Sequence, residues 1–264
     1  MRLITILFWL GGLTFLFSSC YSDKEEQEIF DQAITKISHG EHREAANSLI
    51  ILIDTYPNSP LIARSLYNLA SLYHLHLDNS IQASNYYRLL ARSYKDSIYY
   101  EPALKGLVSI YLNLEQKKVV QAAGVLEILT DNLVAGDSDW VLHKLYLGDS
   151  YMELKQYIKA RLVYKEIIES TALNKNNLKL VIFSYFKIGY SFELVGMNNM
   201  ALLAYQECEN ITNNGKKSVY VAVRMANLYE RDRKIKLARK IYQSILNRLD
   251  AADPLYKIYQ NKII

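Results

Sequence analysis

Glycine, proline and cysteine are all scarce in this chain of 264 residues. It contains 10 glycines, 4 prolines and 2 cysteines. So few glycines and prolines disfavour an all-β fold with many turns and favour long helices. The two cysteines, Cys20 and Cys208, are too few for the disulfide framework of a small secreted domain.

A large excess of charge of one sign is also lacking. Lys and Arg number 31 and Asp and Glu number 27, so the formal net charge is +4. No basic stripe of the kind that binds nucleic acid stands out, and we expect no nucleic-acid partner. Half of the residues are hydrophobic and 22 are tyrosines.

The N-terminus contains a long apolar run. After Arg2, the segment from Leu3 to Phe17 is uncharged and 15 residues long. As a helix it would span roughly 22 Å at about 1.5 Å per residue, which is short of the roughly 30 Å of a bilayer core. The run therefore predicts a signal peptide over residues 1–19 and not a membrane span.

One spacing pattern recurs between residues 29 and 250. A small residue lies three positions before an aromatic one, and after a turn another small residue lies four positions before a second aromatic one. The clearest copies are Gly148, Tyr151, Tyr157, Ala160, Tyr164, Ile167; Gly189, Phe192, Asn198, Ala201, Tyr205, Cys208; and Ala226, Tyr229, Ile235, Ala238, Tyr242, Ile245. Such spacing predicts two amphipathic helices that meet at small residues.

Three weaker copies precede these, which makes six. The position of the first aromatic residue falls at Lys36 in the atypical first copy and then at Tyr73 and Tyr111, and along the chain it recurs every 37 to 41 residues. One helix pair cannot bury its apolar face alone, so neighbouring pairs must stack. We predict an all-α solenoid of about six helix pairs over residues 29–253 and a capping segment over residues 254–264.

The pattern resembles the tetratricopeptide repeat (TPR), which has small residues at positions 8 and 20 and aromatic residues at 11 and 24. The resemblance covers roughly residues 26–250 and implies a right-handed superhelix with a concave groove that binds proteins. In that family, positions 2, 5, 9, 12 and 13 face the groove. Those positions give the candidate partner-binding residues Arg64, Tyr67, His74, Lys105, Asn113, Asp149, Met152, Glu153, Phe183, Phe186, Tyr190, Glu193, Tyr220, Asn227, Glu230 and Arg231.

An aromatic cluster occurs within this set: Phe183, Phe186, Tyr190 and Tyr220. Exposed clusters of this kind mark interaction sites. The alternative is that Phe183 and Phe186 pack against the C-terminal capping segment. The carboxylate clamp of chaperone-binding TPR proteins is not expected, because Ser109 stands where that clamp has an asparagine, although Lys105 matches its lysine.

The predicted signal peptide ends in Leu16, Phe17, Ser18, Ser19 and Cys20, which resembles the bacterial lipoprotein box. The resemblance implies that signal peptidase II cleaves before Cys20 and that Cys20 carries acyl chains such as palmitate. The alternative is an ordinary signal anchor with a chance cysteine. Residues 20–28 would form an acidic tether, which reaches at most about 32 Å and keeps the repeats near the membrane.

A narrower resemblance concerns the start of the array. The tether, Glu28-Ile29-Phe30 and the segment from Tyr56 to Pro60 are similar to the BamD family, lipoproteins of the outer-membrane β-barrel assembly machinery. The CpoB family, which serves cell-wall and division machinery, shares that last segment. The resemblance implies an envelope scaffold on the periplasmic face of the outer membrane, in β-barrel assembly or alternatively in division.

Residues that could carry catalysis or bind a metal do not form a recognisable constellation. The histidines lack metal-ligand spacing and are interpreted as turn and surface residues: His39, His42, His74, His76 and His143. Cys208 falls at an apolar repeat position and predicts a buried hydrophobe. We therefore expect no enzymatic activity, cofactor, metal or small-molecule substrate.

The lipidation prediction is tested by Cys20→Ala. We expect this change to release the chain from the membrane fraction or to leave its precursor uncleaved, because the acylated sulfur is lost. Fractionation and labelling with radioactive palmitate measure both effects. Unchanged processing and labelling in the variant would show that Cys20 is not the lipidated residue.

Overall fold

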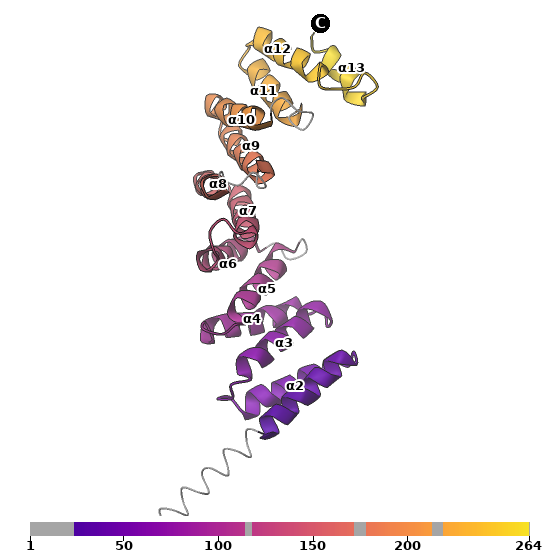
Figure 1. The fold of residues 1–264 in the computed structure, drawn as a ribbon, viewed down its shortest axis with the longest axis vertical. Helices are drawn as coiled ribbons and strands as arrows, with labels where there is room; N and C mark the ends of the chain where they lie inside the picture. The colour runs from indigo at the N-terminus through magenta and orange to yellow at the C-terminus, as the bar shows by residue number, and fades with distance from the viewer. Residues whose placement is uncertain (1–23, 114–117, 172–177, 213–218, 264) are drawn as a thin grey trace, which may run out of the picture. The chain divides into compact units, whose positions relative to one another are not determined.

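The computed structural model describes residues 24–113, 118–171, 178–212 and 219–263, and all the regular elements in these ranges are helices (Figure 1). A first helix covers residues 24–38. The others are α2 (His42–Thr55), α3 (Ile62–Leu75), α4 (Ser80–Ser93), α5 (Tyr100–Leu112), α6 (Val119–Asn132), α7 (Ser138–Glu153), α8 (Tyr157–Thr171), α9 (Leu178–Leu194), α10 (Asn198–Thr212), α11 (Val219–Arg231), α12 (Ile235–Leu246) and α13 (Pro254–Gln260).

The first helix begins earlier than the sequence suggested. Residues 24–28, expected to be part of the tether, already belong to it. Glu25 and Glu28 lie in its first turns, where negative charge is stabilised by the helix dipole. Glu26 is largely buried and Phe30 is fully buried, so this acidic segment is anchored to the first pair and does not extend freely.

Backbone hydrogen bonds confirm the register of all six repeats. In each pair, the carbonyl oxygen at the first-aromatic position accepts a hydrogen bond from a backbone N–H just past the turn or loop, at 2.8–2.9 Å. The acceptor–donor pairs are Lys36–Glu41, Tyr73–Asn79, Tyr111–Lys118, Tyr151–Gln156, Phe192–Met197 and Tyr229–Lys234. Such bonds satisfy carbonyls that the end of a helix would leave without a partner.

The chain divides into two compact units, Met1–Lys118 and Val119–Ile264. In the first unit α3 packs against α4, and α4 packs against α5. In the second, each helix from α6 to α13 packs against the next along the chain (Figure 1). The division separates α5 from α6, the two helices of the third predicted pair.

Tyrosine rings fill the space that small residues leave between paired helices. Tyr164 of α8 and Tyr205 of α10 are fully buried. A Cβ placed on Gly148 would lie 2.6 Å from the Tyr164 ring, and one on Gly189 would lie 2.5 Å from the Tyr205 ring. The small residue and the second aromatic residue of the repeat are therefore one packing unit, and neither can change size independently.

The C-terminal segment caps the last pair. The ring of Tyr259, from α13, stacks on Tyr242 of α12 at 5.8 Å between centroids, and Ile263 packs on the same core. Lys262 forms an ion pair with Glu230 at 3.1 Å. Residues 254–263 thus cover apolar surface that a further repeat would otherwise bury.

None of the described helices is long and apolar enough to cross a membrane. The predicted signal peptide and Cys20 lie outside the described residues. The membrane attachment inferred from them therefore stays a prediction.

The tyrosine–glycine packing predicts that Gly189→Ala destabilises the protein. The added methyl group meets a ring that is buried on all sides, and overpacking of this kind costs about 1–3 kcal/mol. Thermal unfolding followed by circular dichroism should show a lower midpoint than that of the wild type.

Gly124→Ala in α6 is the matched control. A Cβ at Gly124 meets no atom within 4 Å, so this change should stabilise the helix by roughly 0.5–1 kcal/mol. Equal shifts of the two midpoints would contradict the proposed packing constraint.

Candidate functional site

The predicted groove residues are divided between the two units. The first contains Arg64, Tyr67, His74, Lys105 and Asn113. The second contains Asp149, Met152, Glu153, Phe183, Phe186, Tyr190, Glu193, Tyr220, Asn227, Glu230 and Arg231. Each unit therefore presents its own set of candidate residues, on the first helices of its pairs.

In the first unit these residues contact aromatic rings. The guanidinium of Arg64 lies 4.6 Å from the centroid of the buried Phe30 ring. Tyr67 stacks on Tyr99 with centroids 5.3 Å apart. Burial lowers the pKa of His74, so its neutral form is favoured. Lys105 forms an ion pair with Glu101 of its own helix at 2.8 Å, and Asn113 follows the end of α5.

In the second unit, ion pairs join candidate residues on successive first helices. Asp149 of α7 accepts a hydrogen bond from Lys187 of α9 at 2.6 Å. Glu193 of α9 pairs with Arg224 and Arg231 of α11 at 3.0 and 3.3 Å. These contacts bring α7, α9 and α11 to one surface and compensate the charges on it.

Three rings of the predicted aromatic cluster contact one another. Phe186 stacks with Tyr190 at 6.3 Å between centroids and lies 5.3 Å from Tyr220 of α11. Phe183 is 39% exposed and Tyr220 is 60% exposed. The rings around Phe186 come from α9, α10 and α11, whereas the C-terminal segment packs against Tyr242. The contacts of Phe186 therefore favour a surface cluster over packing against the cap.

Two cations lie over the rings of this cluster. The Lys187 ammonium is 5.0 Å from the centroid of Phe183, and the Arg224 guanidinium is 4.7 Å from that of Tyr190. Since each cation also pairs with an acid, both aromatic side chains are held in place from the helix surface. The cluster is thus a pre-organised apolar surface.

Comparisons with known proteins identify the fold. No protein-family model matches the sequence, and no curated protein matches it either. Among solved structures, YrrB, "a TPR protein with an unusual peptide-binding site", is 16% identical, with a TM-score of 0.51 over 82% of this chain and 99% of its own. The fold is that of the TPR proteins. The predicted fold class, an all-α solenoid of TPR helix pairs, is therefore confirmed.

A second structure supports the same fold assignment. The TPR-like repeats of a kinesin light chain described as from Podosopora anserina are 14% identical, with a TM-score of 0.51 over 78% of this chain and 98% of theirs. Identities this low establish the TPR fold and leave the partner to be inferred from this chain's own side chains.

The contacts between the repeat tyrosines and the predicted groove residues were not predicted from the sequence. In four repeats, the tyrosine at the second aromatic position crosses its pair and places its hydroxyl on a polar first-helix side chain on or near the predicted groove. The pairs are Tyr87–Ser71 at 3.0 Å, Tyr164–Asp149 at 2.6 Å, Tyr205–Glu193 at 3.0 Å and Tyr242–Asn227 at 3.0 Å. The two partners of each hydrogen bond lie 12 to 16 residues apart in the sequence. This separation predicts a contact only when the way in which the two helices cross is known.

These hydrogen bonds and burial shift the tyrosine pKa values. Burial, then the neighbouring Asp149 carboxylate, raises the pKa of Tyr164 far above its ordinary value of 10. Burial raises that of Tyr205 as well, with Glu193 adding to the effect and Arg224 opposing it. Burial and Glu230 raise the pKa of Tyr242 to about 12. All three phenols therefore stay neutral donors at physiological pH.

His39 and His76 are exposed, as predicted, whereas His42 and His74 are half-buried. His143 is buried, and its Nδ1 lies 2.7 Å from the carbonyl oxygen of Asp139. His42 and His76 stack with ring centroids 4.0 Å apart, because the turns of the first two pairs meet. Within the described ranges, no group of three or more His, Cys, Asp and Glu side chains could hold a metal ion.

Cys208 is buried, as its repeat position predicts. Its thiol donates to the carbonyl oxygen of Ile182 at 3.3 Å, and burial raises its pKa to about 12. A thiol held neutral in this way is a poor nucleophile. Its role in the described structure is to pack between α9 and α10.

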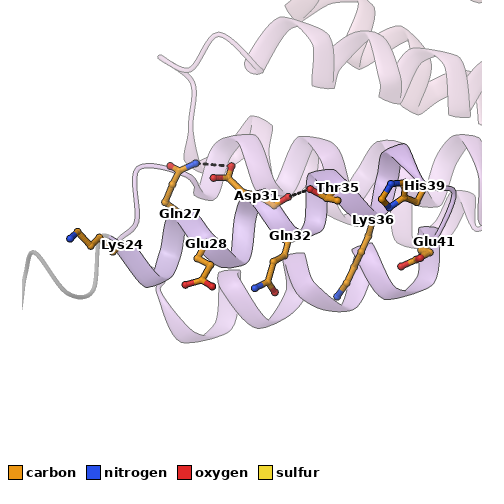
Figure 2. A pocket seen from close by; sticks show the side chains of 9 residues that line it. All are labelled: Lys24, Gln27, Glu28, Asp31, Gln32, Thr35, Lys36, His39 and Glu41. Carbon is orange, nitrogen blue, oxygen red and sulfur yellow. Dashed lines mark hydrogen bonds between the residues drawn. The ribbon is translucent and has the colours of Figure 1, made fainter.

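Two hollows lie away from the groove. The first follows the polar face of the first helix, where Gln27 donates to Asp31 at 2.9 Å (Figure 2). Figure 2 shows its side chains spaced along the helix, without converging on one point. The second is an apolar hollow between α8 and α9, lined by Ile158, Leu162 and Phe192. Neither hollow was predicted from the sequence.

The raised tyrosine pKa values predict a loss of stability in alkali. The unfolded chain ionises its tyrosines near pH 10, whereas folded Tyr242 ionises near 12. The stabilisation is fully present below pH 10 and is lost as pH rises towards 12. The thermal midpoint should fall in this window, and Tyr242→Phe should reduce the fall.

Tyr220→Phe, which changes an exposed ring, is the control and should follow the wild-type curve. If the thermal midpoint of Tyr242→Phe fell with pH as steeply as that of the wild type, ionisation of Tyr242 would not be the cause of the fall.

Proposed function

We propose that this protein is a lipid-anchored scaffold that binds a segment of another protein on the concave TPR surface of its second unit. The aromatic cluster Phe183, Phe186, Tyr190 and Tyr220 carries the proposal. Neighbouring cations hold the exposed Phe183 ring and the half-buried Tyr190 ring before any partner arrives, and Tyr220 lies against Phe186. Binding to a rigid surface loses less conformational entropy, so pre-organisation raises affinity.

The charges of this surface favour an apolar or aromatic partner segment. Asp149 and Glu193 are already paired with basic side chains. A strongly charged partner would have to compete with these pairs, whereas an apolar side chain gains directly from the exposed rings. The fold neighbour YrrB is described as having a peptide-binding site, which supports a peptide segment as the ligand.

The location proposed for the scaffold rests on the sequence. The lipoprotein box at Cys20 and the following polar residues support attachment to the bacterial envelope, with Tyr21 after the cysteine favouring the outer membrane. The proposed task is outer-membrane protein assembly, in the manner of the BamD family. The alternative is a scaffold for cell-wall or division machinery, in the manner of the CpoB family.

Depletion of the protein separates these tasks. If the task is outer-membrane protein assembly, depletion should lower the levels of outer-membrane β-barrel proteins. A pull-down with the mature chain should then recover a barrel-assembly protein from detergent-solubilised envelope. Unchanged barrel levels together with recovery of only peptidoglycan-associated or division proteins would reject the first task in favour of the second.

The binding surface is tested by the double variant Phe183→Ala, Tyr220→Ala. Both rings are exposed, so the thermal midpoint should change little, while affinity for the recovered partner should fall about 30-fold or more, the effect of removing a binding hot spot of about 2 kcal/mol. Calorimetry or surface plasmon resonance measures the affinity.

Leu203→Ala is the matched control, because Leu203 is an exposed apolar residue on the second helix α10, away from the cluster. The proposal requires that this variant bind like the wild type. Equal losses from both variants, or none from the double variant, would place the partner elsewhere.

A further inference from the structure

The positive charge of the chain is concentrated at its C-terminal end. Residues 231–264 contain nine basic and three acidic side chains, a net charge of +6. The preceding 230 residues contain 22 basic and 24 acidic side chains, a net charge of −2. The small total of +4 therefore conceals two regions of opposite sign, and this is why the sequence analysis found no basic stripe.

The structure gathers part of this charge on one exposed face. Helix α12 buries Ala238, Tyr242 and Ile245 against the core, while Lys236 and Lys240 lie on its exposed side, one turn apart. Arg233 precedes the helix and is also exposed. Among the described residues, none of these three cations has an ion-pair or hydrogen-bond partner. We call Arg233, Ile235, Lys236, Leu237 and Lys240 the α12 face.

Two large aliphatic side chains lie among these cations. Ile235 is 48% exposed and Leu237 is 46% exposed, although α12 has a core available on its other side. Cations alternating with exposed aliphatic side chains on a surface helix are the chemistry of attachment to an anionic lipid interface. The ammonium groups meet phosphates, and the aliphatic groups enter the headgroup boundary.

The arrangement lowers the stability of the isolated protein. Lys236 lies in the first turn of α12 and Arg233 just before it, at the positive end of the helix dipole. The positive end of the helix dipole repels these two cations. No acidic residue occurs in the first turn of α12 to offset this repulsion. An anionic surface removes this repulsion.

We propose that the α12 face binds membranes containing anionic phospholipid, as a second attachment independent of Cys20. Lipid is favoured over nucleic acid because the nearby rings are not free for base stacking. Tyr242 is buried, and Tyr229 is half-buried with the Lys234 ammonium 6.0 Å from its centroid. Lipid is favoured over an acidic protein because Ile235 and Leu237 are exposed beside the cations, and such aliphatic groups can enter the headgroup boundary of a membrane.

The test uses residues 21–264, which include every helix that the structure describes, so that the lipid anchor cannot contribute. Flotation is measured with vesicles of phosphatidylcholine alone and of phosphatidylcholine mixed with phosphatidylglycerol. The chain should float with the mixed vesicles and not with the neutral ones, and added salt should weaken the association.

The triple variant Arg233→Gln, Lys236→Gln, Lys240→Gln should lower partitioning onto the mixed vesicles about a hundredfold, since each surface cation contributes about fivefold. Its thermal midpoint should equal or exceed that of the wild type, because the mutual repulsion of the cations is removed. A wild-type level of flotation in this variant would overturn the proposal.

The matched control removes the same charge from the region of α8, as Lys155→Gln, Lys159→Gln, Lys165→Gln, and should float like the wild type. An equal loss in this control would show that net charge alone is responsible, and the α12 face would not be a site. Binding of a short RNA or of polyglutamate by the wild type in the absence of vesicle binding would also overturn the proposal. The Phe183→Ala, Tyr220→Ala variant should retain flotation, which separates this face from the groove.

Discussion

The structure depends on the close approach of two helices around a buried tyrosine. In the pairs α7–α8 and α9–α10, a glycine on the first helix leaves room for the ring from the second, and a Cβ there would lie within 2.6 Å of ring atoms. The ring is packed between the two helices of its pair. The apolar side chains that the pair does not bury face the neighbouring pairs. Stacking is then required to bury it.

The same tyrosines connect the core to the groove. Tyr164 and Tyr205 end in hydrogen bonds to Asp149 and Glu193, which in turn hold Lys187 and Arg224. Those cations lie over the rings of the aromatic cluster. A buried side chain thus fixes an acid, the acid fixes a cation, and the cation fixes an exposed ring. Phe183 and Tyr190 of the proposed binding surface are therefore held in place without any contribution from a ligand.

The two proposed surfaces differ in chemistry because they lie on different helices of the repeat. The predicted groove residues lie on first helices, where Asp149 and Glu193 pair with basic side chains of neighbouring pairs. The α12 face belongs to the last second helix, and its cations find no acidic partners among the described residues. The proposed membrane attachment through the α12 face would therefore leave the aromatic cluster available to a protein segment.

The sequence by itself determined the helix pairs, their register and the identity of the packing residues. These follow from local periodicity and from the size match between glycine or alanine and tyrosine, which are properties of short segments. It also predicted the aromatic cluster, because positions within a repeat map onto faces of a helix.

The tertiary structure alone decided the remaining features: the tyrosine-to-groove hydrogen bonds, the stacking of His42 on His76, and the isolation of the α12 cations. Each depends on distances between residues on different helices, and such distances are set only when the pairs pack. Spacing along one helix contains no information about them.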